Sequence, residues 1–357
     1  MQTQRMSFIQ SFSKLFPSKS SFIIFSLYII LFCNHGILVT ASQTSSNRYE
    51  YNVATVVLLT ETLKLLASVG LYCKDNEPKS LVKDVVKNKT VLALYLIPAF
   101  LYCLYNNLSF ENLLRFDPTT YNLLLQFRIF FTAILFQVLF KKTLTGKQWL
   151  SLVILTLGCM LKQLDFNAES ADSNAKMYGF NLFSWSTVLI LVQMLCSCFA
   201  GVYNEYLLKN DGANVNIFVQ NVFMYLDSIF CNILVLLFHG NLSTAFQYDN
   251  LAKIMNFKVI ILMINNASVG IITSFFLKQL NSILKTFASA LELVFTAILC
   301  YFLFHIPIAL STVMAICTVL FAVYLYTQNP VKGQEHDKES LEIEREELLM
   351  DEVLVKE

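Results

Sequence analysis

The chain has 357 residues, of which 56% are apolar and 14% are charged, and its formal net charge at pH 7 is +1. Soluble globular proteins carry about 25% charged residues, so this composition excludes an ordinary soluble domain and indicates an integral membrane protein.

Ten stretches are apolar enough to cross the hydrocarbon core, which takes about 20 residues in a helix. They are too long and alternate too little to be strands of a membrane barrel, which run about 10 residues. The sequence therefore predicts an all-α membrane protein with ten transmembrane helices, preceded by segment 1–20 and followed by an acidic tail at 329–357. In chain order the predicted helices cover about residues 21–41, 53–73, 91–110, 119–140, 148–164, 181–206, 215–239, 257–277, 281–304 and 307–327.

Lysine and arginine are unequally divided between the loops. Thirteen lie on the side of the N-terminus and six on the other side, leaving out the tail. Basic loops stay in the cytosol, so we expect both termini to be cytosolic and Asn241, which begins an Asn-Leu-Ser sequon, to be lumenal. A signal peptide over residues 1–41 is the alternative, but its apolar run exceeds the usual length of about 7 to 15 residues.

Short motifs recur five predicted helices apart. Phe-Thr-Ala-Ile-Leu stands at 131–135 and again at 295–299, and Asn106-Asn107 is matched by Asn265-Asn266. Because five is odd, the second half would be inverted in the membrane relative to the first. The motifs predict two inverted five-helix repeats, at about 21–164 and 181–328, an arrangement common in secondary transporters. Chance similarity between apolar helices is the other interpretation.

Three cations fall inside predicted spans, namely Lys64, Arg128 and Lys285. A charge at the centre of a membrane helix costs about 2.5 to 3.5 kcal/mol, so each needs a partner or a function. Glu61 precedes Lys64 by three residues and is placed to pair with it. Arg128 and Lys285 have no acid within one turn and occupy corresponding spans of the two repeats. We therefore expect them to bind an anion, for which arginine supplies a planar two-pronged donor.

Two polar residues flank Arg128 at helical spacing. Tyr121 lies two turns before it and Thr132 one turn after it, so a planar base could stack on the tyrosine ring. The nine cysteines fall in or at the edges of the spans and are expected to serve packing. The four histidines are scattered without metal spacing, so no metal, cofactor or membrane-embedded enzyme is predicted.

Several segments resemble one family, the nucleotide-sugar transporters of the drug/metabolite transporter superfamily, and within it the branch that carries UDP-sugars and CMP-sialic acid. The resemblance extends over residues 21–328 and implies a ten-helix antiporter of the Golgi or endoplasmic reticulum. Its strongest parts are LLTETLKLLASVGLYCK, DPTTYNLLLQFRIFFTAILFQVLFKK, CFAGVYNEYLLK, QNVFMYL and NSILKTFASALELVFTAILCYFLF.

The resemblance implies a role for each matching residue. Arg128 would bind the nucleotide phosphate, with Tyr121 and Thr132 lining the nucleotide pocket and Lys64 and Lys285 near the phosphates and the sugar. The resemblance also places three residues elsewhere in the pocket, Asn221 and Tyr225 at the base and ribose and Ser197 at another position. Glu61 and Asn107 are added as further candidates. This chain departs from the family's common pattern at Thr286, where glycine is frequent, and at Arg128, where lysine is commoner.

The function implied is import of a UDP-sugar into the Golgi lumen in exchange for UMP, with UDP-galactose favoured over UDP-N-acetylglucosamine. A CMP-sialic acid transporter and a non-transporting membrane scaffold are the alternatives. The expected partners are the nucleotide sugar, the nucleoside monophosphate and the lipid bilayer, with a homodimer or bound glycosyltransferases as further expectations. No nucleic-acid partner is expected.

Overall fold

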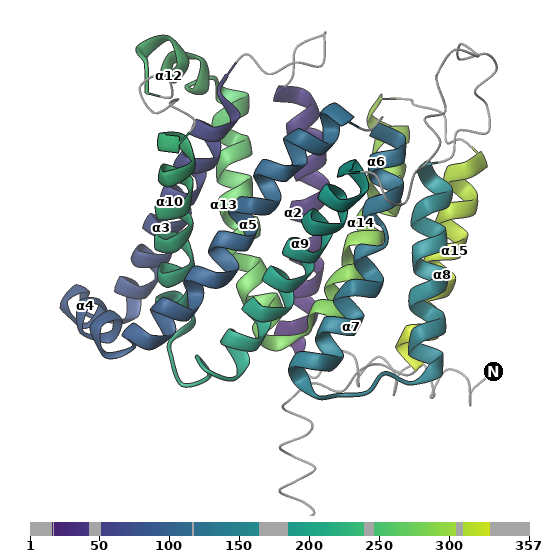
Figure 1. The fold of residues 1–357 in the computed structure, drawn as a ribbon, viewed down its shortest axis with the longest axis horizontal. Helices are drawn as coiled ribbons and strands as arrows, with labels where there is room; N and C mark the ends of the chain where they lie inside the picture. The colour runs from purple at the N-terminus through teal and green to yellow at the C-terminus, as the bar shows by residue number, and fades with distance from the viewer. Residues whose placement is uncertain are drawn as a thin grey trace, which may run out of the picture.

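The structure, a computed structural model, describes residues 16, 18–42, 51–115, 118–163, 185–238, 246–304 and 310–328. The elements within these ranges are all helices (Figure 1). In chain order they are α2 (Lys19–Ser42), α3 (Val53–Asp75), α4 (Pro78–Lys87), α5 (Lys89–Arg115), α6 (Pro118–Leu125), α7 (Arg128–Phe140), α8 (Gly146–Gln163), α9 (Trp185–Lys209), α10 (Ile217–Phe238), α12 (Tyr248–Ile254), α13 (Phe257–Gln279), α14 (Ser282–Phe304) and α15 (Leu310–Gln328).

Each of the ten predicted spans overlaps helix in the structure, so the all-helical membrane class is confirmed. Eight stretches within the described ranges are long and apolar enough to cross a membrane, while α8 is apolar over the shorter stretch Gly146–Leu161. The number ten therefore stays a prediction. The predicted N-terminal segment, apart from its last residues, lies outside the described ranges, as do the Asn241 sequon and the acidic tail.

The predicted helix over 119–140 is wrong in one respect, because it is two helices, α6 and α7. At the joint the backbone tightens to i→i−3 hydrogen bonds, from Gln126 N to Leu123 O at 3.1 Å and from Phe127 N to Leu124 O at 3.2 Å. The stretch contains no proline or glycine that would have predicted a break. Arg128 begins α7 directly after this joint, rather than sitting inside a continuous helix.

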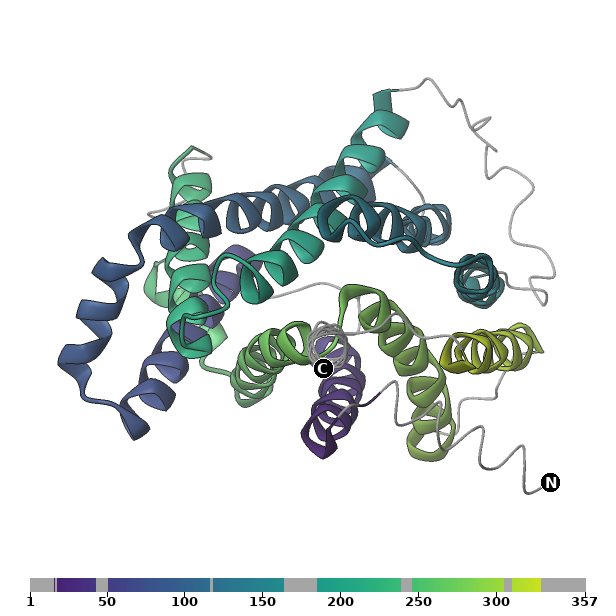
Figure 2. The ribbon, with the colours of Figure 1, turned by 90° about the horizontal axis from the view of Figure 1, so that it is seen from below.

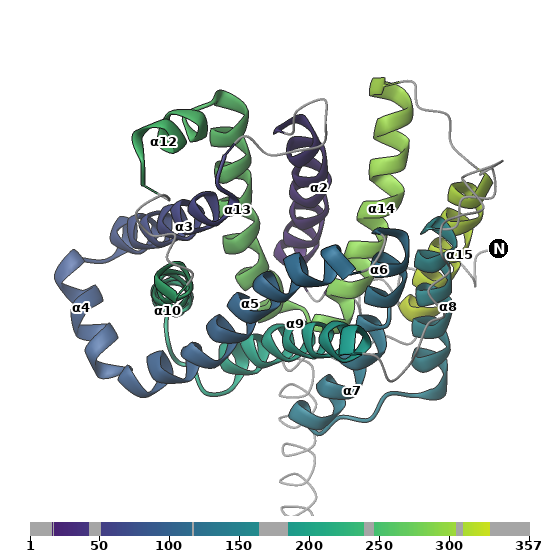
Figure 3. The ribbon, with the colours of Figure 1, turned by 45° about the horizontal axis from the view of Figure 1, so that its top comes forward.

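The helices pair closely across the chain. The pairs with the most extensive contact are α8 with α15, α5 with α9, α2 with α13, α3 with α10, α5 with α10, α7 with α9, α3 with α13 and α2 with α14. Figures 2 and 3 show the crossing of these helices from below and from an oblique angle. Gly158 permits the first pair, since a Cβ there would lie 3.0 Å from Val319 Cγ2.

Apolar side chains cover much of the outer surface of the bundle. Val138 is 68% exposed, Trp185 67% and Phe238 86%. In a soluble protein such a surface would associate or aggregate, whereas lipid acyl chains cover it in a bilayer. Polar side chains gather inside instead, where they line two cavities.

Candidate functional site

The first cavity has a volume of about 310 Å³ and is here named the Arg128 cavity. It lies between α7, α9 and α14, with Tyr102 of α5 and Cys159 of α8 at its edges. Arg128 and Lys285 both line it, as predicted for an anion site, although α7 and α14 are far apart in the sequence. Thr132 and Ser197 are the other predicted site residues that contribute to its wall.

Arg128 and Lys285 share the lining of the Arg128 cavity with one carboxylate, Glu292 of α14. Two salt bridges lie elsewhere in the bundle and join Lys64 to Glu61 and Lys209 to Glu205. Lys285 lies near enough to Arg128 to be repelled by its charge and near enough to Glu205 to be attracted by that carboxylate. Arg128 is exposed to the cavity and Lys285 is partly buried. The lining therefore carries more positive than negative charge, with hydroxyl groups beside it, and this favours a bound anion.

A buried carboxylate anchors the helix that carries Lys285. Glu205 of α9 is fully buried, and its Oε2 accepts hydrogen bonds from the backbone N–H of Ser282, at 2.7 Å, and from the Ser282 hydroxyl. Its Oε1 pairs with Lys209 at 2.7 Å, and Lys209 also donates to the carbonyl of Leu280. Ser282 is the first residue of α14, so this network fixes the helix one turn before Lys285.

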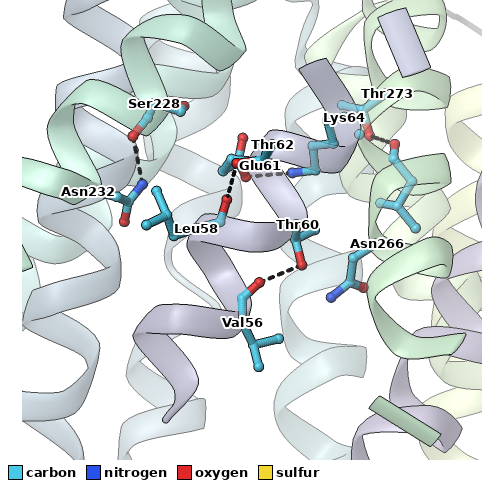
Figure 4. Close-up of polar contacts among 12 residues, drawn as sticks. Val56, Leu58, Thr60, Glu61, Thr62, Lys64, Ser228, Asn232, Asn266 and Thr273 are labelled. Carbon is cyan, nitrogen blue, oxygen red and sulfur yellow. Dashed lines mark hydrogen bonds and ion pairs between the residues drawn. The ribbon is translucent and has the colours of Figure 1, made fainter. Parts of the chain in front are cut away.

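The second cavity has a volume of about 370 Å³ and is here named the Lys64 cavity. It lies between α2, α3, α5, α10 and α13, with Asn204 of α9 also in its lining. Figure 4 shows Glu61 and Lys64 of α3 joined in its wall, with Ser228 and Asn232 of α10 on one side and Asn266 and Thr273 of α13 on the other. The predicted pairing of Lys64 with Glu61 is confirmed at 2.7 Å.

Lys64 lies close to Tyr225 of α10 and Gly270 of α13. Its Nζ lies 5.6 Å from the ring centroid of Tyr225, within the range of a cation–π contact. A Cβ added at Gly270 would lie 2.9 Å from Lys64 Cε and 3.1 Å from the Tyr225 hydroxyl. Gly270 therefore leaves the room in which these two side chains meet at the cavity wall.

Comparison with known proteins identifies the family. The family model described as "Nucleotide-sugar transporter" matches residues 18–327. The UDP-galactose transporter senju of Drosophila melanogaster is 58% identical over 345 residues, which cover 89% of this chain and 89% of that one. The chain belongs to the nucleotide-sugar transporter family.

Other relatives are more distant. CMP-sialic acid transporter 1 of Oryza sativa subsp. japonica is 28% identical over 85% of this chain and 93% of its own, and its namesake in Arabidopsis thaliana is 26% identical. A solved crystal structure of a protein with 13% identity superposes with a TM-score of 0.61, covering 87% of this chain and 97% of that one. At that identity the likeness concerns the fold alone.

Three predicted site residues of this nucleotide-sugar transporter line neither cavity. The Tyr121 hydroxyl accepts a hydrogen bond at 2.7 Å from Gln193 Nε2, and Gln193 accepts one from Asn112. The ring of Tyr121 is thus in a buried chain between α5, α6 and α9. Asn107 donates its amide to the carbonyl of Cys103 in its own helix.

Asn221 is the third residue outside both linings. It is buried one turn before Tyr225, which does line the Lys64 cavity. Its Nδ2 has no hydrogen-bond partner within the described part of the chain. A buried amide donor without a partner costs about 1 to 3 kcal/mol, so Asn221 is suited to a ligand or a water molecule that enters from the cavity.

Sequence reasoning missed two features of the transporter's interior. Tyr102 lines both cavities and so stands where they adjoin. His35 Nδ1 lies 2.6 Å from Asn266 Oδ1, and both residues line the Lys64 cavity. In the sequence, only the repeated Asn-Asn motif points to Asn266. His35 belongs to the scattered histidines and has no motif that would indicate a role. Groups of three or more His, Cys, Asp or Glu placed to hold a metal are absent from the described ranges.

Proposed function

We propose that this protein is a Golgi antiporter that imports a UDP-sugar into the lumen in exchange for UMP, with UDP-galactose as the favoured cargo and UDP-N-acetylglucosamine as the second. The 58% identity to a UDP-galactose transporter supports the UDP-sugar class over the CMP-sialic acid class, whose relatives are 26 to 28% identical. The observation on which the proposal depends is that Arg128 and Lys285, from helices far apart in the sequence, line one cavity together.

The diphosphate of the cargo would occupy the Arg128 cavity. The guanidinium of Arg128 donates two parallel hydrogen bonds to one phosphate, and Lys285 supplies a point charge to the other. The hydroxyl groups of Thr132 and Ser197 line the same wall and donate further hydrogen bonds. These groups replace the water that the phosphates lose, and their attraction is stronger in a cavity than in bulk water.

The nucleoside would extend past Tyr102 toward the Lys64 cavity. Tyr225 and the unpartnered amide of Asn221 supply an aromatic face and a donor for the base and ribose. Lys64, held by Glu61, lines the Lys64 cavity and would contact the part of the nucleotide that enters it. Thr286 lines the Arg128 cavity, so its replacement of the family's frequent glycine narrows the space available to the sugar.

Exchange follows from the charge of the empty site. Without ligand, closing the Arg128 cavity to both sides would enclose Arg128 and Lys285 with Glu292 as the one carboxylate of the lining. The remaining positive charge is costly in a low-dielectric interior. A bound nucleotide or nucleotide sugar removes that cost, so the loaded protein changes conformation more readily than the empty one.

The proposal also includes two inverted repeats within a transporter domain at 21–328, with both ends of the chain in the cytosol. If α6 and α7 count as one span and α4 and α12 are left out, a shift of five spans exchanges pair α2–α13 with α9–α5. It likewise exchanges α3–α13 with α10–α5 and α2–α14 with α9–α7, and it returns α3–α10 and α8–α15 to themselves.

In Figure 1, α2 begins and α15 ends at the lower end of the bundle, which supports termini on one side.

The decisive experiment uses proteoliposomes that contain the purified protein. Labelled UMP exchange should be competed by UDP-galactose at lower concentration than by UDP-N-acetylglucosamine, and only weakly by CMP-sialic acid. Uptake should need internal nucleotide. Equal uptake with and without internal UMP would contradict exchange, preferential competition by CMP-sialic acid would favour that class, and absence of any nucleotide-dependent uptake would favour a non-transporting scaffold.

Endoplasmic reticulum residence is the alternative to the Golgi. A homodimer and an association with glycosyltransferases belong to the same proposal. Cross-linking in Golgi membranes, followed by identification of the linked chains, tests both associations.

A further inference from the structure

Helix α4 connects two membrane spans at one end of the bundle. The stretches Val53–Asp75 and Lys89–Ser109 are both apolar enough to cross a membrane, and α4 lies between the end of the first and the start of the second. It contacts α3, α5 and α10, and Figures 1 and 2 show it at the edge of the lower end of the bundle. This position is the level at which the two spans leave the hydrocarbon core.

The apolar residues of α4 form two stripes. Leu81 and Val85 face inward, where they pack against a buried cluster that includes Tyr72 and Tyr95. Val82 and Val86 face outward, and their side chains are 65% and 66% exposed. The spacing of four residues places these two valines one above the other on the helix surface.

The basic residues of α4 form a third stripe. Lys79, Lys83 and Lys87 also follow one another at a spacing of four, and all three are exposed. The one acid of the helix, Asp84, accepts a hydrogen bond of 2.6 Å from the Tyr72 hydroxyl and is thereby directed inward. The outward surface of α4 is therefore cationic beside an apolar strip.

We propose that α4 lies in the membrane interface and binds the headgroups of anionic phospholipids. Val82 and Val86 enter the boundary between headgroups and acyl chains, and the three lysines contact the headgroup charges beside them. An apolar strip beside lysines is typical of interfacial helices, and anionic lipid is the partner with complementary charge. Two valines give too little area for a stable protein interface, which buries about 800 Å² on each side.

The test measures lipid binding without any transport substrate. The full-length protein is purified in neutral detergent, phosphatidylserine or phosphatidylcholine is added in steps, and the melting temperature is followed. We expect phosphatidylserine to raise the melting temperature at lower mole fraction than phosphatidylcholine, and this preference to fade at high salt because the Debye length shortens. Each lysine near an anionic surface contributes roughly a fivefold gain in binding. The triple variant K79Q/K83Q/K87Q should therefore need at least tenfold more phosphatidylserine.

The matched control is K147Q/K253Q/K258Q, which removes three exposed lysines that do not lie on α4. It should keep the wild-type response. The variant V82S/V86S should lose the part of the response that survives high salt. The proposal is overturned if the wild-type protein shows no preference for phosphatidylserine, or if the two triple lysine variants respond alike. Because the readout needs no nucleotide, failure here leaves the transport proposal intact.

Discussion

At the scale of single residues, the central observation is the convergence of Arg128 and Lys285. Their separation of 157 positions gives no indication of distance, yet both line the Arg128 cavity. The third intramembrane cation, Lys64, lines the other cavity and is paired with Glu61. Arg128 and Lys285 are therefore the groups whose removal should affect anion binding in the Arg128 cavity most directly.

Replacing Arg128 by alanine should raise the KM for nucleotide exchange. A hydrogen bond to a charged group is worth about 1.5 to 3 kcal/mol, so the expected loss is roughly 10- to 150-fold. Arg128→Lys should keep the charge but lose the two-pronged geometry and show a smaller loss. Exchange kinetics in proteoliposomes measure this, with Lys147→Ala as an exposed control of the same charge change. A KM within twofold of wild type for Arg128→Ala would place the phosphates elsewhere.

Replacing Gly270 by alanine should disturb the Lys64 cavity. The new Cβ would lie 2.9 Å from Lys64 Cε, so the lysine must leave its place beside Tyr225. We expect exchange to fall several-fold while the protein still folds. Gly70→Ala is the matched control, because a Cβ at Gly70 meets no atom within 4 Å. Equal activity of the two variants would show that the position of Lys64 is unimportant for transport.

At the scale of elements, the anchoring of α14 by Glu205 connects stability with function. The carboxylate holds the first residue of α14, and Lys285 follows one turn later. Leaving one charge of a buried pair without its partner is more damaging than removing both.

Glu205→Met should destabilise the protein by about 3 to 5 kcal/mol, because Lys209 is left buried without its partner. The double variant E205M/K209M should recover part of that loss. Thermal unfolding in detergent measures both. A double variant no more stable than Glu205→Met would mean that the hydrogen bonds to Ser282, rather than the ion pair, carry the stability.

The elements also show which helices sequence patterns predict and which they miss. Long apolar runs located the helices because a membrane span must satisfy its own backbone hydrogen bonds. The same patterns did not reveal the joint between α6 and α7, because Leu-Gln-Phe-Arg contains no helix breaker. They also did not predict α4, whose lysines counted only toward the basic loops. The inward apolar, outward apolar and basic faces of this short helix can be told apart only when the helices packed against it are known.

At the scale of the whole molecule, the proposed orientation makes a direct prediction. Epitope tags at both termini should be accessible to antibody when the plasma membrane alone is permeabilised, because the basic loops lie on that side. A tag inserted beside Gln247, before α12, should become accessible only after the Golgi membrane is opened. In the opposite pattern, with the tag at Gln247 exposed first, the proposed direction of transport would be reversed.

The sequence by itself determined the membrane class, the positions of the helices, the three intramembrane cations and the resemblance to a family. These properties depend on composition, local periodicity and motif order, all of which are readable along one chain. The tertiary structure decided that Arg128 and Lys285 share a cavity, that Tyr121 and Asn107 lie outside both cavities, and that Tyr102 stands between them. Those facts depend on how helices far apart in the chain pack and rotate against each other, which is set by side-chain fit such as that at Gly158 and Gly270 rather than by any local pattern.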